Sequence, residues 1–321
     1  CGLLGLCLRW QDHKASAISA MPMGMPGWPE LAFCTASMDK ARIALAIRVD
    51  CRGRSRAGNC MRKPFGCKFN RPASLSHRPV HPRLLCADLT CGLLILDEEN
   101  SHHLAVVLRA QVGDRVVIFD GQGREGQGVL RTADKTKAVV EIESIQTISR
   151  ESPLHITVLQ ALCTGDKMDW VVQKSTELGA AQVVPVAAAR SLLKLEPGRA
   201  LKRLEHWRAI AQAAAAQSGR TIVPTISPVM SFREALLDWT QRQSPKTGWL
   251  LDPFAEERFS TAPTQGPIAI WIGPEAGWTD EEEQTAAVAG IRGLRLGPRI
   301  LRTETVAAVA LTAIAMKCGE F

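Results

Sequence analysis

Two segments of the chain combine glycine, proline and charged side chains in a way that could bind a ligand. Residues 271–278 read WIGPEAGW, and residues 296–305 read LGPRILRTET. Glycine reaches backbone conformations that other residues avoid, and it lets a ligand approach the main chain closely. Neither segment has the G-K-[ST] ending of a P-loop or the G-x-G-x-x-G spacing, so a phosphate site is not indicated. An ordinary tight turn is typical of each segment taken alone.

The elements expected around the two segments strengthen the ligand interpretation. Each segment follows an apolar, strand-like run, IAIWI or GLRL, and precedes a helix-like stretch. In parallel α/β sheets, ligands bind beyond the carboxyl ends of strands, where loops lead into helices. Thr279 and Glu282 have the spacing of a capping box, and Thr303 suits the N-cap of the last helix. We therefore predict one ligand site formed by both segments.

A small β-barrel domain is predicted over residues 80–150. Short runs of β type, separated by glycine-rich turns, indicate strands at 93–97, 115–121, 126–132 and 137–145, with one helix at 101–110. The residue pattern changes near 149–153, and predicted strands then alternate with predicted helices. Strands are expected at 155–162, 182–188, 248–252, 267–273 and 293–297, and helices at 167–179, 203–219, 279–289 and from about Thr303. This alternation predicts a mostly parallel sheet covered by helices in a second domain, residues 151–321.

The basic charge of the chain belongs to its first 79 residues. The formal net charge is +7, yet residues 1–79 hold 13 Lys and Arg against 4 Asp and Glu, so the remainder is near −2. This leader has no apolar periodicity, and it could be a transit peptide or upstream sequence from a wrongly chosen start. We favour the second interpretation, with translation beginning near Val80, so that the leader is either non-native or disordered. Any contact with nucleic acid must then use local patches of the body.

Cysteine spacing and hydropathy indicate a cytoplasmic protein without a metal or a membrane partner. Eight of the 10 cysteines lie at or before Cys91, without the paired C-x2-C spacing of structural zinc sites. The apolar stretch VAAVALTAIAM is shorter than the 18 or so residues that span a bilayer.

Four longer motifs resemble those of a known enzyme family. IGPEAGWTDEE, LRLGPRILRTETVAAVALTAI, KMDWVVQKSTELG and QSGR followed by VP are similar, in the same order, to the RsmE family of bacterial 16S ribosomal RNA uridine N3-methyltransferases, in the SPOUT superfamily. Ala276 replaces the more usual second glycine. The resemblance covers about residues 83–318. It implies a PUA-like RNA-binding barrel followed by a trefoil-knotted α/β domain that binds S-adenosylmethionine as a homodimer.

The resemblance also assigns the site residues. It implies cofactor binding by three walls of the site, formed by Leu251; by Gly273, Pro274, Glu275 and Gly277; and by Leu296, Gly297, Ile300 and Leu301. The side chains of Leu251 and Ile300 could equally be core packing, so their backbone groups are the better candidates. Arg302 and Glu304 are catalytic candidates, for orienting the base and accepting its proton, although a capped helix start explains them equally well. RNA contacts are implied for Arg83, His103, Arg109 and Arg220.

The function expected is methylation of N3 of a uridine in 16S ribosomal RNA of an assembled or near-mature small subunit. The alternatives are another RNA methyltransferase of the superfamily, acting on a different base or a ribose hydroxyl, and a non-catalytic ribosome-binding factor. The small residues Ala307, Ala310 and Ala313 recur at helical spacing, which suits a packed dimer interface, although alanine is also the best helix former.

Overall fold

The computed structural model describes residues 81–241, 246–262, 264 and 266–321. All of these residues belong to the second of the two units into which the chain divides, residues 71–321. The predictions made for the leader at 1–79 and for a start near Val80 therefore lie outside the described residues. No helix in the described part of the chain is both long and apolar enough to cross a lipid bilayer.

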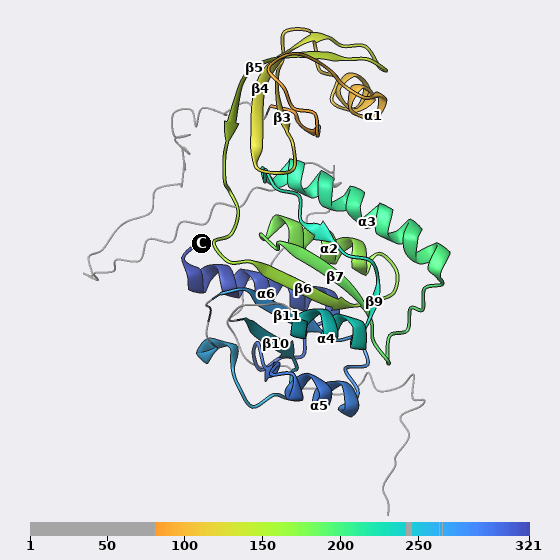
Figure 1. Ribbon diagram of the computed structural model, residues 1–321, viewed down its shortest axis with the longest axis vertical. Helices are drawn as coiled ribbons and strands as arrows, with labels where there is room; N and C mark the ends of the chain where they lie inside the picture. Colours follow the sequence, from red (N-terminus) through yellow and green to blue (C-terminus); the bar gives the residue numbers. More distant parts are fainter. Residues whose placement is uncertain (1–80, 242–245, 263, 265) are drawn as a thin grey trace, which may run out of the picture. The chain divides into compact units, whose positions relative to one another are not determined.

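The first part of the second unit is a five-stranded sheet curled around its own apolar core (Figure 1). Its strands run in the order β1-β3-β4-β5-β2, with β1 Arg83–Leu85, β2 Gly92–Ile95, β3 Arg115–Phe119, β4 Arg124–Thr132 and β5 Val139–Thr147. Alternate side chains such as Val116, Ile118 and Val140 point into the core, as a strand period of two requires. A Cβ on Gly128 would lie 2.5 Å from the carbonyl oxygen of Glu141, so glycine is required there. The predicted barrel strands are confirmed.

A short helix closes one side of this sheet. It begins with α1, Glu98–His102, and continues as the π-helical turn η1, His103–Val107. Asp97 caps α1, because its carboxylate accepts a hydrogen bond from the Asn100 amide at 2.7 Å. The prediction placed this helix at 101–110, so it was right in kind and about three residues late.

The second part is a parallel sheet in the order β12-β10-β11-β6-β7-β8, with β9 also paired to β7. The strand bounds are β6 Ile156–Ala161, β7 Gln182–Ala187, β8 Thr225–Ile226, β9 Met230–Ser231, β10 Thr247–Leu251, β11 Ile268–Ile272 and β12 Arg292–Leu294. Strands β6 and β11 are buried at every position, which is typical of a parallel sheet covered on both faces. The predicted parallel α/β domain is confirmed, and its trefoil knot stays a prediction.

Helices cover both faces of the parallel sheet (Figure 1). One face packs against α2 Lys167–Glu177, α3 Pro197–Ser218 and α6 Thr303–Cys318, and the other packs against α4 Phe232–Gln241 and α5 Asp280–Val288. A short 3-10 turn, η2, occupies Phe259–Thr261. The helix α4 was not predicted, although Phe232, Ala235, Leu236 and Trp239 recur at helical spacing and are all buried.

One expectation about α6 is wrong. Ala307 and Ala310 are fully buried and belong to the apolar core of their own chain, and Ala313 packs against that core. Ala307 and Ala310 let α6 pack closely on the sheet and are not a surface that a second copy could reach, whereas Ala313 is half-buried.

A network of ion pairs joins the two sheets. The buried carboxylate of Glu125 on β4 accepts hydrogen bonds from Arg83 at 2.5 Å and Arg150 at 2.7 Å. The same two arginines donate to the carbonyl oxygens of Arg220 and Gly219, beyond the end of α3. Burial alone would raise the pKa of Glu125, but the hydrogen bonds from Arg150 and Arg83 outweigh it and hold the pKa below the usual 4.5.

Replacing Glu125 with glutamine is expected to destabilise this unit by on the order of 2 kcal/mol at pH 7, because charge-assisted hydrogen bonds are lost. The effect is not larger because Arg150 is half-exposed and solvent screens its charge. Since folding lowers the pKa of Glu125, its contribution is present above about pH 4.5 and is lost as pH falls through the folded value. Urea denaturation of the wild type and Glu125→Gln at pH 7 and pH 3 checks this. A stability difference that persists at pH 3 would contradict the assignment.

Candidate functional site

The two glycine segments lie together at one edge of the parallel sheet. Strand β10 pairs with β11 on one side and with β12 on the other, and all three are parallel. The segment after β11 begins at Gly273, the segment after β12 contains Gly297, and Asp252 and Pro253 follow β10. Because the carboxyl ends of parallel strands meet at one edge, the three connections form one rim. The prediction that both glycine segments lie at the ends of parallel strands is confirmed, with β10 between them.

A cavity of about 720 Å³ opens at this rim. It gathers both catalytic candidates, Arg302 and Glu304, with most of the residues predicted to bind the cofactor, namely Leu251, Gly273, Pro274, Glu275, Gly277, Ile300 and Leu301. Residues up to 53 positions apart in the sequence, Leu251 and Glu304, therefore line one space. That convergence is the arrangement expected of a binding site.

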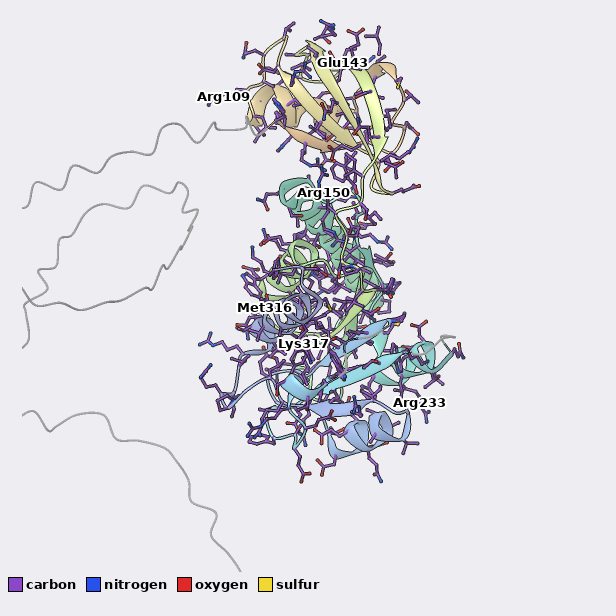
Figure 2. The ribbon with its side chains drawn as sticks, turned by 90° about the vertical axis from the view of Figure 1, so that its left-hand side faces the viewer. Arg109, Glu143, Arg150, Arg233, Met316 and Lys317 are labelled. Carbon is purple, nitrogen blue, oxygen red and sulfur yellow. The ribbon has the colours of Figure 1, made fainter. Side chains whose placement is uncertain are left out.

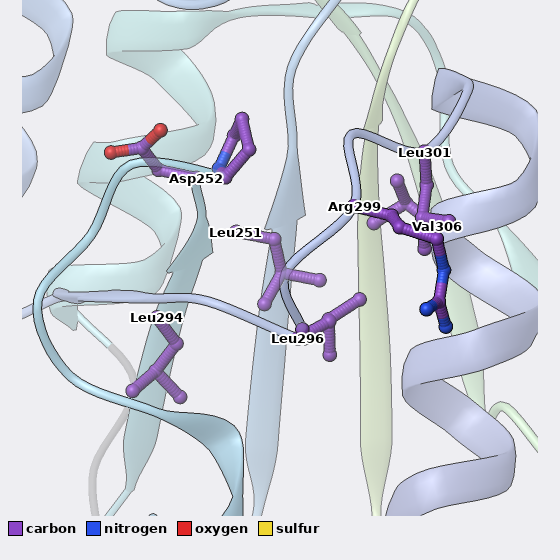
Figure 3. Close-up of a pocket in the computed structure, with 9 residues that line it drawn as sticks. Leu251, Asp252, Leu294, Leu296, Arg299, Leu301 and Val306 are labelled. Atoms are coloured by element: carbon purple, nitrogen blue, oxygen red, sulfur yellow. The ribbon is translucent and has the colours of Figure 1, made fainter.

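The remaining two cofactor candidates line a smaller apolar recess of about 50 Å³ beside the cavity. Leu296 and Gly297 lie here, and the recess shares Leu251, Leu301 and Val306 with the larger cavity. Figure 3 shows leucine side chains from the ends of β10 and β12 and from the segment before α6 converging on it. Its lining is suited to a flat apolar group.

The glycines differ in what they do. Gly277 has a φ of +73°, which side chains other than glycine rarely tolerate. A Cβ on Gly273 would lie 3.1 Å from Nε1 of Trp278, so glycine makes room there for the indole. A Cβ on Gly297 would meet no atom within 4 Å and would enter open space. Close approach of a ligand to bare backbone is thus possible at Gly297, whereas Gly273 is explained by packing.

Hydrogen bonds between residues distant in the sequence link the two glycine segments. The Thr303 hydroxyl donates to the carbonyl oxygen of Gly273 at 2.7 Å and accepts from the side-chain amide of Gln160 at 2.9 Å. Arg302 is the N-cap residue of α6, so the expectation that Thr303 would be its N-cap is wrong. The capping box of Thr279 and Glu282 is confirmed at the start of α5.

The cavity is lined by more acidic than basic side chains. Asp252, Glu275, Asp280, Glu283 and Glu304 line it, against Lys167, Arg190 and Arg302. Burial, reinforced by repulsion from Asp252 and Asp280, raises the pKa of Glu283. A ligand that carries positive charge would relieve this repulsion, so the charge of the site favours a cation.

Sequence reasoning missed several charged residues that line the cavity, among them Lys167. Its Nζ lies 2.6 Å from Oε1 of Glu275 and 3.8 Å from Oε2 of Glu304. Burial alone would raise the pKa of Glu275, but the hydrogen bond from Lys167, the charge of Lys167 and backbone hydrogen bonds together outweigh it and lower the pKa. The signal was available, because Lys167 begins the helix that follows strand β6, at the same edge of the sheet.

The four residues expected to contact RNA fall into two groups. His103 and Arg109 are exposed on the barrel, and Arg109 has a positive φ of 53°. Arg83 is engaged by Glu125 and stacks over the ring of Phe119. Arg220 is buried, with its guanidinium bound to Glu151 and to the carbonyl oxygens of Thr176 and Ala180. In this arrangement Arg83 and Arg220 hold the fold, and His103 and Arg109 face solvent.

We expect the Cys163 thiol, beside the site, to resist alkylation at neutral pH. Burial, with a further contribution from Glu275, raises its pKa to about 12, and the thiolate is the reactive form. Cys91 is exposed and serves as the control within the same chain. Peptide mass mapping after iodoacetamide treatment of the folded protein should find Cys91 modified and Cys163 unmodified. Equal labelling of the two would refute the burial argument.

Comparison with known proteins identifies the families to which the two parts of the chain are similar. Residues 150–315 match the RNA methyltransferase domain family, and residues 96–143 match the RNA methyltransferase PUA domain family. Ribosomal RNA small subunit methyltransferase E of Bacillus subtilis is 36% identical over 229 residues, which are 67% of this chain and 87% of that protein. The protein of the same name from Synechocystis is 34% identical, over 66% of this chain and 69% of that one.

Solved structures give the same result. The crystal structure of a ribosomal RNA small subunit methyltransferase E from Neisseria gonorrhoeae, bound to S-adenosylmethionine, superposes with a TM-score of 0.69 at 36% identity, over 74% of this chain and 98% of that one. A methyltransferase from Legionella pneumophila, in complex with the same cofactor, superposes with a TM-score of 0.69 at 32% identity and the same coverage. The chain therefore belongs to the family of ribosomal RNA small subunit methyltransferases E.

Proposed function

We propose that the protein methylates N3 of a uridine in 16S ribosomal RNA, with S-adenosylmethionine as methyl donor. The observation that carries the proposal is the cavity at the ends of β10, β11 and β12, where Arg302 and Glu304 stand beside the two glycine segments. Membership of the methyltransferase E family supports the same chemistry. The division into an RNA-binding barrel at 80–150 and a catalytic domain at 151–321 is part of this proposal.

The residues present suit S-adenosylmethionine. The apolar recess of Leu251, Leu296 and Leu301 suits an adenine ring, and the open space beside Gly297 allows hydrogen bonds from bare backbone. The excess of carboxylates in the larger cavity suits a ligand with positive charge. When bound, S-adenosylmethionine supplies the methyl group from its positively charged sulfur.

Two side chains could take part in the reaction, one by accepting the N3 proton of uracil and the other by stabilising the negative charge that develops on it. Glu304 lines the cavity at the first turn of α6, and its Oε2 is buried without a hydrogen-bond partner. A carboxylate that lines the cavity can accept the proton from N3, after which the nitrogen electron pair can form the new N–C bond. Arg302 is exposed in the cavity and has no ion pair within the described part of the chain. It would stabilise the negative charge that develops on the uracil oxygens.

The RNA partner is proposed to be an assembled or near-mature small subunit. Residues 80–321 are near charge neutrality, which does not favour tight binding of any RNA through phosphates alone. Recognition of a folded surface, with local contacts from His103 and Arg109 of the barrel, fits that charge better. Figure 2 shows Arg109 at the edge of the barrel. The proposed compartment is the cytoplasm, where such subunits are found in bacteria.

We further propose a homodimer that uses the exposed side of α6. Met316 is 65% exposed on that side (Figure 2), and Val309, about two helical turns before it, is 38% exposed, in contrast to the buried Ala307 and Ala310. Val309→Arg is expected to give monomers, because a charge would be buried in the interface. Val288→Arg, at a valine that is 86% exposed on α5, is the matched control. Sedimentation velocity separates the outcomes, and a dimeric Val309→Arg protein would exclude this face.

The test of the function is mass spectrometry of 16S RNA nucleosides from a strain that lacks the gene. Loss of 3-methyluridine, restored by the wild-type chain, is the expected result. An unchanged 3-methyluridine peak would contradict the proposal. A missing methylated nucleoside of another kind would indicate a different RNA methyltransferase, and an unchanged nucleoside profile would indicate a binding factor without this activity.

A further inference from the structure

Lys167 joins three segments that are far apart in the sequence. It is the first residue of α2, Glu275 lies in the segment before α5, and Glu304 lies in the first turn of α6. The lysine Nζ is 2.6 Å from Glu275 and 3.8 Å from Glu304, so one ammonium group stands between two carboxylates. Positively charged side chains are uncommon near a helix N-terminus, because the helix dipole disfavours positive charge there. A lysine in this position therefore calls for a specific explanation.

The state of Glu304 gives that explanation. Its Oε2 is removed from solvent and has no hydrogen-bond partner, which is costly for an ionised carboxylate unless a cation is near. Among the described residues, Lys167 is the cation that pairs with Glu304 within 4.0 Å. Without that cation, the Glu304 and Glu275 carboxylates would lose the positive charge that they share, and their charged forms would be less favoured.

An ordinary surface ion pair explains the contacts less well. The side chains of Lys167 and Glu275 are 32% and 28% exposed, so their pairing alone would add little stability. That interpretation accounts for the contact with Glu275. It leaves unexplained why the lysine also stands beside the buried oxygen of Glu304, which faces the cavity proposed for the reaction.

We propose that Lys167 is a positioning residue that keeps Glu304 ionised and oriented to accept the N3 proton of uridine, with Glu275 as its anchor. The proposal rests on the function proposed above. In the step concerned, the N3–H bond breaks and its proton passes to a Glu304 oxygen. The electron pair left on N3 forms the bond to the methyl carbon, and the pair of the carbon–sulfur bond stays on sulfur. Glu304 then releases the proton to water.

The groups that face Glu304 leave Lys167 as the source of positive charge. Glu275 faces it from the segment before α5, and the Cys163 thiol faces it from the segment after β6. Burial, followed by the charge of Glu275, raises the pKa of that thiol to about 12, so it is neutral at physiological pH. Arg302, on the same segment as Glu304, is exposed. Arg190, across the cavity, donates to the carbonyl oxygen of Trp278 at 2.6 Å.

The test compares Lys167→Met with the wild type, with Lys167→Arg as the charge-keeping variant. Lys174→Met is the matched control, because Lys174 lies on the same helix and pairs with Glu177 outside the cavity. The first readout is the pH dependence of kcat on small subunits. We expect Lys167→Met to lose at least tenfold in kcat at pH 7 and to move the acidic limb of the profile up by about one pH unit or more. Lys167→Arg should restore most of the rate, and Lys174→Met should change neither.

The second readout does not depend on catalysis. The side-chain carboxyl carbon of Glu304, labelled with ¹³C and identified by its loss in Glu304→Gln, is followed by NMR as pH is varied. Its titration midpoint should lie higher in Lys167→Met than in the wild type and be nearly restored in Lys167→Arg. If Lys167→Met does not fold, the comparison of Lys167→Gln with Lys167→Arg takes its place.

The outcomes separate the two proposals. An unmoved Glu304 signal in Lys167→Met overturns the role of Lys167, whatever the enzyme does. A moved signal with an unmoved acidic limb also overturns it, because Glu304 would then not be the proton acceptor that Lys167 serves. Absence of 3-methyluridine with the wild-type protein refutes the proposed function, and the NMR titration still decides whether Lys167 controls the ionisation of Glu304.

Discussion

Replacing Glu304 with glutamine is expected to lower kcat for RNA methylation by roughly 10²–10⁴, the usual contribution of a general base. Glutamine keeps the size of the side chain but cannot accept a proton from N3. Affinity for S-adenosylmethionine, measured by isothermal titration calorimetry, should change little, because the apolar recess and the backbone at Gly297 are untouched. A variant with near wild-type kcat would remove Glu304 from the chemistry.

The pH dependence of the same variant sharpens this prediction. Uridine loses its N3 proton unaided as the solution becomes more alkaline, so the deficit of Glu304→Gln should shrink with rising pH. A purely structural role of Glu304 would give a deficit that does not vary with pH. Glu281→Gln is the control, since Glu281 is an exposed carboxylate in the first turn of α5. It should behave as the wild type at every pH.

The arrangement of strands and helices was largely predictable because it depends on local periodicity. Buried β11 is a continuous apolar run, β6 is mostly apolar, and the barrel strands alternate. The closeness of the two glycine segments followed from one general rule on parallel sheets. Helix ends were less certain, as at Thr303, whose hydroxyl bonds the Gly273 carbonyl across the site instead of capping α6. That contact depends on residues 30 positions apart.

Side-chain roles that depend on distant partners could not be predicted in the same way. A lysine at the start of a helix has no local feature that reveals Glu275, 108 positions later. The same holds for Ala310, which has helical spacing whether its neighbours belong to its own core or to a second copy. Gly273 and Gly297 are the same residue type in the sequence, but their surroundings differ. The indole of Trp278 fills the space beside the backbone of Gly273, and the space beside Gly297 is open.

Arg220 and Arg109 are expected to respond to alanine substitution in opposite ways. Arg220 is 5% exposed, and its guanidinium binds Glu151 and two backbone carbonyl oxygens, from Thr176 and Ala180. Removing it leaves a partly buried carboxylate and two carbonyl groups without their donor. Breaking such a buried pair costs about 3–5 kcal/mol, so Arg220→Ala should lower the urea midpoint markedly. Any loss of RNA binding should then follow the loss of folded protein.

Arg109→Ala should leave the urea midpoint unchanged, because the Arg109 side chain is exposed and no hydrogen bond or ion pair of that side chain is found within the described residues. If Arg109 contacts a phosphate of the RNA, its loss should weaken binding to small subunits and reduce the slope of log affinity against log salt by about 1. Arg233→Ala, at an exposed arginine of α4, is the control (Figure 2). The decisive measurement is filter binding at several salt concentrations, on samples shown to be folded. A fully stable Arg220→Ala protein that has lost RNA affinity would contradict the structural role of Arg220. Arg220 would then be the RNA contact that its motif implies, and its interactions within the protein would be dispensable.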